Sequence, residues 1–472
     1  MLIGRRYWSP AAPLLVTGAL LAGLAGAGPV GTATRSQTGP AQECGPTAAP
    51  SQAPWPQFGG SRARSQSATG ANVTAPLRRR WLSGALDGAI YAEPVVAGGC
   101  AYVATEDDSV YAFALATGAM VWHTHVASPV TSGLACGGDI NPSGITGAPV
   151  LDTARHELWA VVLTSVAGRP QHEVVALDTR TGRVVRRQPV AVPGTDPTAE
   201  QQRSALAFAD GRVYVAFGGL YGDCGSYRGA IVSVPVTAGS ALAYWRTPTA
   251  REGAVWEVGG PDLLPDGRLL FATGNSAASP GQPFDGGDAV IELAPDLRQA
   301  SYFAPRAWAQ WNVADLDLGS TGPALLPGGL AFQVGKAGEG FLVSTAHLGG
   351  VGGQLASVPV CPGQGAYGAD AVRGGTVYVP CTGGVVALRV AGRSATVLWR
   401  SSAGGAGSIL TAGGRVFEEE QDGRLVALSS ASGRVLQSLS LSPPVTHFPW
   451  LAAAGGTLLV ANGTRLEALT GI

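Results

Sequence analysis

Residues 93–122 read EPVVAGGCAYVATEDDSVYAFALATGAMVW, and this stretch decides the fold. It contains four short runs of β-branched, aromatic and small apolar residues. Glycines, the acidic turn Glu106-Asp107-Asp108 and the pair Thr117-Gly118 separate the runs. Short runs bounded by turn residues predict four consecutive antiparallel strands. No amphipathic helical pattern of about 10–15 residues stands between such units, so a parallel α/β sheet is not expected.

The third run of this unit recurs along the chain. The last three copies are separated by 40 and 41 residues, measured at Ala387, Ala427 and Ala468. That interval is the length of one four-stranded propeller blade. Eight copies therefore predict an all-β, eight-bladed β-propeller over residues 76–472, with seven blades as the alternative count. The copies are 110–115, 174–178, 231–234, 290–293, 341–344, 385–388, 425–428 and 466–469.

Two irregularities in the repeat carry further information. The eighth copy ends after its third strand, at Ile472, so its blade lacks an outer strand. We expect Arg80-Trp81-Leu82-Ser83 to supply that strand, because joining the first and last blades removes an exposed sheet edge. The interval from Ser233 to Glu292 is 59 residues, so the middle blades carry insertions.

Composition excludes several classes of protein. The 472 residues carry a formal net charge of −1, with 46% hydrophobic and 13% charged residues. This balance argues against a disordered chain and against a nucleic-acid binder built on a basic patch. The chain has thirty arginines and one lysine, Lys336, a bias typical of a GC-rich bacterial genome.

The N-terminus predicts export from the cytoplasm. Arg5 and Arg6 precede an apolar stretch over 11–24, and Gly31-Thr32-Ala33 offers a small-residue cleavage site. Residues 1–33 are therefore expected to be a signal peptide, with an uncleaved membrane anchor as the alternative. Residues 34–75 are expected to form a Pro/Ser-rich stem and lead-in. The mature protein would be extracellular, in the cell envelope or periplasmic.

Six cysteines in an exported chain favour disulfides over a metal site, since no C-x-x-C pair occurs. Cys361 with Cys381 is the best-supported pair, because the two are close in sequence at successive strand ends. Cys136 with Cys224 and Cys44 with Cys100 are the remaining pairs. The histidines form no set spaced for a metal, although His123 and His125 alternate along one predicted strand.

The repeat resembles the pyrroloquinoline quinone (PQQ) repeat over nearly all of the mature chain. The resemblance rests on Tyr-Val in the second strand, Val-Tyr-Ala in the third, and Thr-Gly-x-x-x-Trp in the fourth. It implies the fold of quinoprotein alcohol dehydrogenases. The same blade occurs in a non-catalytic outer-membrane assembly lipoprotein, so the fold alone does not decide the function.

The middle of the chain resembles the quinoprotein dehydrogenases more closely. The segments Ala254-Val-Trp256 and Gly274-Asn275 imply that Trp256 lies under the quinone and that Asn275 binds both cofactor and Ca²⁺. Asp315-Leu-Asp317 implies a catalytic and calcium-binding aspartate at Asp317, with Asp315 as the alternative. Gln333-Val-Gly-Lys336 implies that Lys336 contacts the quinone oxygens and assists catalysis. Asp223 stands where the family has an acidic calcium ligand.

These residue types suit the implied chemistry. A hard cation with oxygen ligands polarises the quinone, and a carboxylate accepts the proton of the alcohol. An aromatic ring orients a planar cofactor, and a cation stabilises developing negative charge on the quinone oxygens. Two family features are missing: Cys136 is followed by glycine rather than a second cysteine, and no arginine follows it closely. No haem-attachment motif is present either.

Three functions are therefore expected as alternatives. The first is an exported PQQ- and Ca²⁺-dependent dehydrogenase of a small alcohol or sugar, for which the five site residues should lie together. The second is a scaffold that binds other cell-envelope proteins, for which they should be scattered. The third is a propeller that binds or cleaves carbohydrate. None of them involves nucleic acid, and the membrane is reached only through the possible N-terminal anchor.

Overall fold

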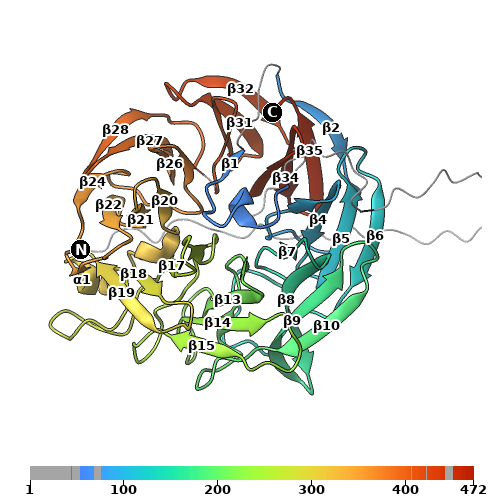
Figure 1. Ribbon diagram of the computed structural model, residues 1–472, viewed down its shortest axis with the longest axis horizontal. Helices are drawn as coiled ribbons and strands as arrows, with labels where there is room; N and C mark the ends of the chain where they lie inside the picture. Colours follow the sequence, from blue (N-terminus) through green and yellow to red (C-terminus); the bar gives the residue numbers. More distant parts are fainter. Residues whose placement is uncertain (1–43, 45–53, 69–75, 406, 421, 442–449) are drawn as a thin grey trace, which may run out of the picture. The chain divides into compact units, whose positions relative to one another are not determined.

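The computed structural model describes Cys44 and residues 54–68, 76–405, 407–420, 422–441 and 450–472. These residues form eight sheets that follow one another around a ring in sequence order (Figure 1). Each sheet contains four antiparallel strands, which confirms the predicted eight-bladed propeller. The predicted signal peptide, residues 1–33, lies outside the described residues. In the part of the chain that is described, no helix has the length and apolar character needed to cross a membrane.

The first four blades contain the following strands. Blade 1 is β3 (Val95–Ala97), β4 (Cys100–Ala104), β5 (Ser109–Ala114) and β6 (Met120–His125). Blade 2 is β7 (Val150–Asp152), β8 (Glu157–Val166), β9 (Arg169–Asp178) and β10 (Val184–Pro189). Blade 3 is β12 (Ala207–Ala209), β13 (Arg212–Gly219), β14 (Ala230–Pro235) and β15 (Ala243–Arg246), with β11 (Glu200–Gln201) paired to the end of β13. Blade 4 is β16 (Asp262–Leu263), β17 (Leu269–Ala272), β18 (Val290–Leu293) and β19 (Gln299–Ala304), with β23 (Gly350–Val351) parallel to its edge.

The last four blades follow the same plan. Blade 5 is β20 (Ala324–Leu326), β21 (Leu330–Val334), β22 (Glu339–Ser344) and β24 (Ala356–Pro359). Blade 6 is β25 (Ala371–Arg373), β26 (Thr376–Cys381), β27 (Gly384–Ala391) and β28 (Ser394–Arg400). Blade 7 is β29 (Leu410–Ala412), β30 (Arg415–Glu419), β31 (Arg424–Ser429) and β32 (Val435–Ser440). Blade 8 is β33 (Trp450–Ala454), β34 (Thr457–Asn462), β35 (Arg465–Thr470) and β2 (Arg78–Leu82).

Strand β2 closes the ring as predicted. It pairs antiparallel with β35, so that Trp81 faces Ala468 and Leu82 faces Glu467. An N-terminal strand thus completes the last blade, and the chain continues directly into blade 1 (Figure 1). The closure leaves the third strand of blade 8 without a free edge.

The repeated Thr-Gly-x-x-x-Trp motif connects neighbouring blades. Trp122 of blade 1 donates from its indole Nε1 to the carbonyl of Thr179 in blade 2, at 2.9 Å. Gly182 packs directly on the Trp122 ring: its φ is +72°, and a Cβ there would lie 2.6 Å from a ring carbon. Only glycine accepts both the backbone angle and the close approach. The same contact occurs between Trp81 and Gly118, and between Trp399 and Gly433.

Residues 54–68 line the inside of the ring, a feature the repeat did not predict (Figure 1). This segment, which we call the axial segment, includes η1 (Phe58–Gly60) and β1 (Ser67–Ala68). Its backbone hydrogen-bonds to the inner strands of blades 1, 2, 4, 6 and 7, at Val96, Leu151, Leu263, Val372 and Thr411. The packed part of the propeller therefore includes residues that precede position 76.

Buried charged groups anchor the axial segment. The Arg64 guanidinium donates to the carbonyls of Gly259, Pro261 and Leu206. Glu93 accepts hydrogen bonds from the Trp55 indole at 2.6 Å and from the Gln66 amide at 2.6 Å. Because every one of these groups is buried, the segment is fixed by specific polar contacts as well as by Trp55 and Phe58 in the apolar core.

Three disulfides join the described residues, and they confirm all three predicted pairs. Cys361–Cys381 links blades 5 and 6. Cys44–Cys100 attaches Cys44 to β4. Cys136–Cys224 joins two loops that lie beside the candidate site. Three disulfides indicate an extracytoplasmic protein.

Candidate functional site

Blade topology places the predicted site residues on one face of the propeller. In an antiparallel blade, the first strand begins and the second strand ends on the same face. Trp256 precedes β16, and Asn275 follows β17, in blade 4. Asp317 precedes β20, and Lys336 follows β21, in blade 5. The long connections after β15, β17 and β19 carry Trp256, Asn275 and Asp317, whereas Lys336 lies in the short turn between β21 and β22.

Lys336 and Asp317 form the centre of the site. The Lys336 ammonium forms an ion pair with the Asp317 carboxylate and a second one, at 2.7 Å, with Asp315. The Asp317 side chain is only 4% exposed, whereas Asp315 caps α1 (Trp308–Ala314) and is 71% exposed. The other Asp317 oxygen accepts a hydrogen bond from the Asn275 backbone amide at 2.5 Å. The buried aspartate is thus held from two blades.

The electrostatics of this pair are set by burial. Burial raises the pKa of Asp317, and the ion pair with Lys336 opposes that rise. Burial also disfavours the Lys336 ammonium, but the charges of Asp317 and Asp315 raise the pKa of Lys336 overall. Lys336 is therefore cationic at neutral pH, next to a carboxylate whose affinity for a proton exceeds that of an exposed aspartate.

Trp256 lies close to two cations. Its ring centroid is 5.5 Å from the Lys336 Nζ and 5.9 Å from the Arg203 guanidinium carbon. Gly274 allows Trp256 and Asp317 to approach each other: a Cβ at this glycine would lie 2.8 Å from the Trp256 indole nitrogen and 2.5 Å from an Asp317 oxygen. Trp256 itself is half-buried, so part of its ring is accessible.

Arg203 was not predicted from the sequence. It comes from the loop between β11 and β12, so it enters the site from blade 3 rather than from the segment that follows Cys136. Burial lowers the pKa of Arg203, and the charges of Asp139, Tyr91 and Glu106 oppose this. An arginine remains charged under these conditions. Its position beside Trp256 is visible only once blades 3 and 4 are packed together.

Acidic groups lie on the other side of the site. Asp223 accepts a hydrogen bond from the buried Tyr227 hydroxyl. Burial raises the pKa of Glu252, and the nearby charges of Asp223, Asp317 and Asp285 raise it further, while Arg251 lowers it. Of the predicted residues, Lys336 thus contacts Asp317 and lies beside Trp256, and Asn275 reaches Asp317 through its backbone amide. The charges of Asp223 and Asp317 both act on Glu252, so Asp223 lies in the same neighbourhood. Glu252 was not predicted, although it directly precedes the segment that contains Trp256.

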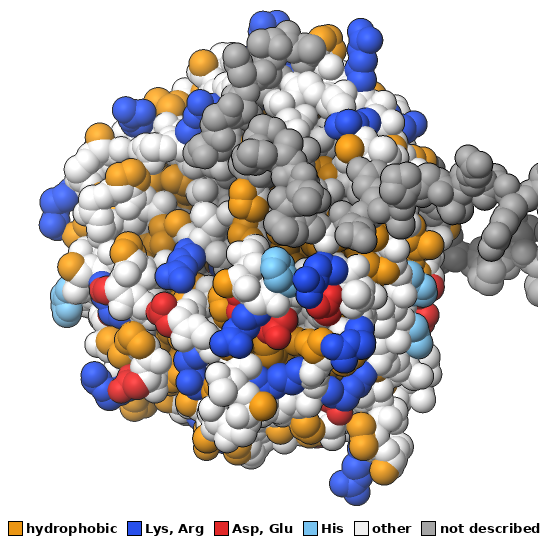
Figure 2. All heavy atoms as spheres, turned by 45° about the vertical axis from the view of Figure 1, so that its right-hand side comes forward, with side chains coloured by type: hydrophobic (Ala, Val, Ile, Leu, Met, Phe, Trp, Pro, Cys, Tyr) orange, Lys and Arg blue, Asp and Glu red, His pale blue; other side chains and the backbone are white. Residues whose placement is uncertain are grey.

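The oxygen donors of this site are not gathered around one point. Among the described residues, a single group of at least three His, Cys, Asp or Glu side chains has its ligand atoms within 4.8 Å of one another, and it lies in blade 1. Asp223 and Asp317 are not members of that group. Figure 2 shows basic and acidic side chains interspersed over one face of the molecule, with no continuous basic patch.

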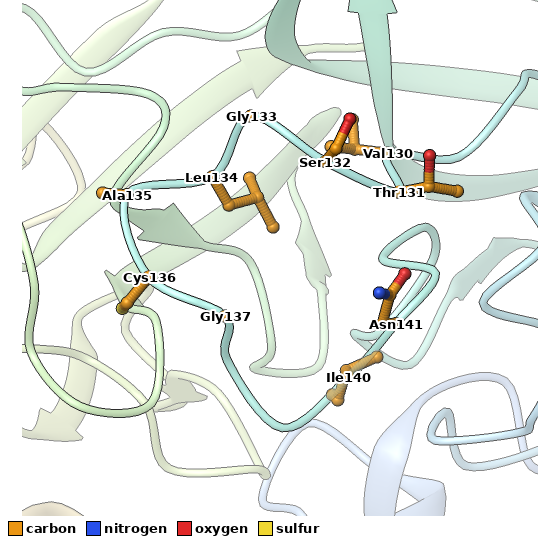
Figure 3. Close-up of a pocket in the computed structure, with 10 residues that line it drawn as sticks. All are labelled: Val130, Thr131, Ser132, Gly133, Leu134, Ala135, Cys136, Gly137, Ile140 and Asn141. Atoms are coloured by element: carbon orange, nitrogen blue, oxygen red, sulfur yellow. The ribbon is translucent and has the colours of Figure 1, made fainter.

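A pocket opens next to the Cys136–Cys224 disulfide. Its volume is about 300 Å³, and the loop between β6 and β7 forms most of its wall. Leu134 and Asn141 point into the space that this loop encloses (Figure 3). Asp139, in the same loop, acts electrostatically on Arg203, so the pocket and the Trp256 site are neighbours. The disulfide also fixes this loop against the loop that carries Asp223.

Comparisons with known proteins agree with this architecture. The family model described as "Outer membrane protein assembly factor BamB" matches residues 77–277 and 349–471. The sequence has no match among curated proteins. The assignment of the chain to a family by sequence therefore rests on this family model.

Solved structures of two kinds share the fold. The quinohemoprotein alcohol dehydrogenase of Comamonas testosteroni matches with a TM-score of 0.67 at 16% identity, over 89% of this chain and 80% of that chain. A europium-containing methanol dehydrogenase matches with a TM-score of 0.63 at 16% identity, over 87% and 90%. BamB of Moraxella catarrhalis matches with a TM-score of 0.55 at 14% identity, over 84% and 98%. Identities this low show the fold alone.

Proposed function

The chain belongs to the family described as outer membrane protein assembly factor BamB, a family of PQQ-like repeat propellers, and we propose that this member is an exported dehydrogenase. In this proposal it binds PQQ and Ca²⁺ and oxidises a small alcohol or a sugar. One observation carries the proposal: Lys336 is held by the buried carboxylate of Asp317 and lies 5.5 Å from the Trp256 ring. A buried ion pair beside a partly accessible indole, with perturbed pKa values, is the kind of cluster that is typical of functional sites.

The residues present fit a planar, polyanionic quinone. When bound, the quinone supplies the carbon that accepts a hydride. The accessible part of the Trp256 ring would support one face of the cofactor. Lys336 would donate to the quinone oxygens, and Arg203 would pair with a carboxylate, in place of the arginine missing after Cys136. Asn275 and Asp223 would offer oxygen ligands to a Ca²⁺ ion that the cofactor also coordinates.

Asp317 would receive the proton of the substrate hydroxyl. Its raised pKa, caused by burial, makes it a better proton acceptor than an exposed aspartate. Its hydrogen bond from the Asn275 amide fixes one oxygen, and Lys336 stabilises its charged form. The pocket beside Cys136 is large enough for a small alcohol or a monosaccharide, and its loop adjoins Arg203.

A dye-linked assay tests this function. Purified protein, supplied with PQQ and Ca²⁺, is screened against short alcohols and monosaccharides with an artificial electron acceptor. We expect turnover of at least one substrate, and we expect Asp317→Asn to lower kcat by about 100-fold or more, since general-base catalysis contributes 10²–10⁴ in rate. The control Asp266→Asn changes an exposed acid outside the site and should have no effect. Equal activity in both variants would contradict the assignment of Asp317.

A second candidate function, that of a scaffold for other proteins, rests on exposed apolar side chains of the outer strands. Six blades each expose a large apolar side chain on their outer strand: Leu82, Met120, Val185, Tyr244, Leu398 and Val435. Single exposed apolar side chains are common on protein surfaces, so this rim supports a partner-binding role less strongly than the Trp256 site supports the dehydrogenase. If this rim were the functional surface, the chain would act as a scaffold for cell-envelope proteins, and cross-linking in cells would capture partners whether or not PQQ binds.

A further inference from the structure

Two histidines and two aspartates meet at the edge of blade 1, on the same face as the candidate site. Asp87 comes from the connection between β2 and β3, and Asp107 from the turn between β4 and β5. His123 and His125 lie on β6. Ligand atoms of Asp87, Asp107 and His125 are all within 4.8 Å of one another. The His123 Nε2 is 3.5 Å from an Asp87 oxygen, and the His125 Nδ1 is 3.9 Å from an Asp107 oxygen.

We propose that Asp87, Asp107 and His125 bind a divalent transition-metal ion, with zinc as the best fit, and that His123, whose Nε2 is 3.5 Å from an Asp87 oxygen, turns toward the ion to become the fourth ligand. Two imidazoles and two carboxylates form a donor set that zinc accepts in tetrahedral geometry, whereas Ca²⁺ and Mg²⁺ prefer oxygen donors alone. Tetrahedral ligands at about 2.1 Å from zinc lie roughly 3.4 Å from one another. The 3.5 Å contact already meets this spacing, and the 3.9 Å contact requires only a small side-chain movement.

The surroundings orient the donors. Asp87 accepts hydrogen bonds from the hydroxyls of Thr105, at 2.9 Å, and of Ser109, at 2.5 Å. The His123 ring stacks on Tyr111, with ring centroids 4.1 Å apart and an interplanar angle of 11°. Hydrogen bonds and ring contacts to the ligand side chains fix the direction of these ligands and increase metal affinity.

Close backbone packing brings Asp87 to the other ligands. A Cβ at Gly88 would lie 2.6 Å from the Asp107 backbone nitrogen and 3.2 Å from the Thr105 side chain. The glycine therefore allows the segment that follows β2 to lie directly on the β4–β5 turn. A larger residue at this position would move Asp87 away from the two histidines.

The site would have a structural role. Asp87 lies in the connection after β2, and the backbone of that connection donates hydrogen bonds to blade 8 from Leu86 and Ile90, while the other three ligands belong to blade 1. A bound ion would thus join the closing strand to the first blade, in addition to the hydrogen bonds between β2 and β35. Because the ion would bind the folded state alone, it should stabilise the propeller.

Calorimetric titration of the full-length protein with zinc chloride, after treatment with a chelator, tests the proposal. We expect one equivalent to bind with a Kd of about 10 μM or lower, and the thermal midpoint to rise with zinc and fall with EDTA. His125→Gln and Asp87→Asn should each weaken binding by at least about tenfold. The matched control His347→Gln removes an exposed histidine far from the site in sequence and should leave binding unchanged.

Two results would overturn the proposal. One is the absence of saturable zinc binding below about 100 μM. The other is equal binding in His125→Gln and His347→Gln, which would assign the zinc to unrelated surface groups. Because the ligand side chains are partly exposed, the variants should fold, and their circular dichroism spectra would verify this. The readouts need neither PQQ nor substrate, so they are independent of the proposed dehydrogenase activity.

Discussion

Lys336, the single lysine of the chain, holds its ammonium 5.5 Å from the centre of the Trp256 ring while it forms an ion pair with Asp317. Lys336 and Trp256 come from neighbouring blades, 5 and 4, and the Lys336 side chain is 16% exposed. A lysine retained here, in a chain that otherwise uses arginine, is consistent with a point charge that a planar guanidinium does not replace. The predictions below follow from this site and from the packing that supports it.

Arg203 should contribute to cofactor affinity. Its guanidinium is buried beside Trp256, so removing the charge in Arg203→Met should weaken PQQ binding by about tenfold or more. Fluorescence titration with PQQ measures this effect. Arg298→Met is the control, because Arg298 is 74% exposed and pairs with an exposed aspartate. Unchanged affinity in Arg203→Met would remove Arg203 from the site.

Substitution of Gly182, the glycine of the blade motif, should destabilise the protein for two reasons, its positive φ and its contact with the Trp122 ring. Gly182→Ala places a methyl group against Trp122 at a positive φ, and we expect it to lower the free energy of unfolding by about 2–4 kcal/mol. Gly168→Ala has a similar φ, +78°, but no atom within 4 Å of the new Cβ, so about 1 kcal/mol is expected. Urea denaturation of both variants gives the difference, and equal losses would show that the Trp122 contact contributes nothing.

The axial segment should be required for stability. Arg64→Met leaves three carbonyls without their donor, and it removes the cation whose charge reaches the buried acids Asp262, Glu257 and Glu93. We expect a loss of about 3–5 kcal/mol, typical of a buried charge left without its partner. Arg62→Met is the neighbouring control, since its pair with Asp210 is exposed and long, at 3.9 Å. Equal denaturation midpoints for the two variants would contradict this role.

Stability should decrease as pH rises from about 5 to 8. Burial raises the pKa of Glu93 and of Glu106 to about 7, and that of Asp108 to about 8. Below their unfolded-state pKa these groups are protonated in both states. Above it the carboxyl groups ionise in the unfolded state while they stay protonated in the folded state. The free energy of unfolding therefore falls as pH rises through the folded-state pKa, by up to about 1.4 kcal/mol per pH unit for each group.

Thermal denaturation at several pH values measures this dependence. Glu106→Gln keeps an acceptor for the Gly144 amide and the Thr146 hydroxyl, and it removes one titrating group, so its pH dependence should be flatter than that of the unmodified chain. A midpoint that rises between pH 5 and pH 8 would show that other groups dominate.

The repeat and the closing strand could be predicted from sequence because their signals are local. Each strand of a blade is a short apolar run next to a turn, and the glycine-to-tryptophan contact repeats with the blade. The axial segment could not be predicted in this way. Residues 54–68 carry no blade pattern, and their partners lie in five different inner strands. Trp55 and Phe58, two aromatic residues in a stretch expected to be a stem, were the available signal.

The candidate site likewise contains residues that could be predicted from sequence and residues that could not. Trp256, Asn275, Asp317 and Lys336 belong to segments that resemble a known family in order and spacing, and the structure connects them through Lys336 and Asp317. Arg203 and Glu252 have no such motif, since their positions depend on how blade 3 packs on blade 4. The blade 1 cluster likewise joins Asp87 to His123 and His125 across two chain segments that only the closed ring brings together.

The central claim is that this propeller binds PQQ with the aid of Ca²⁺, and calorimetric titration of the purified protein with PQQ tests it most directly. Binding should require Ca²⁺, and it should weaken by at least about tenfold in Lys336→Met and in Asn275→Ala, because each removes a contact to cofactor or ion. The absence of binding at tens of micromolar PQQ, with Ca²⁺ present and the protein folded, would contradict the claim and direct attention to the apolar rim.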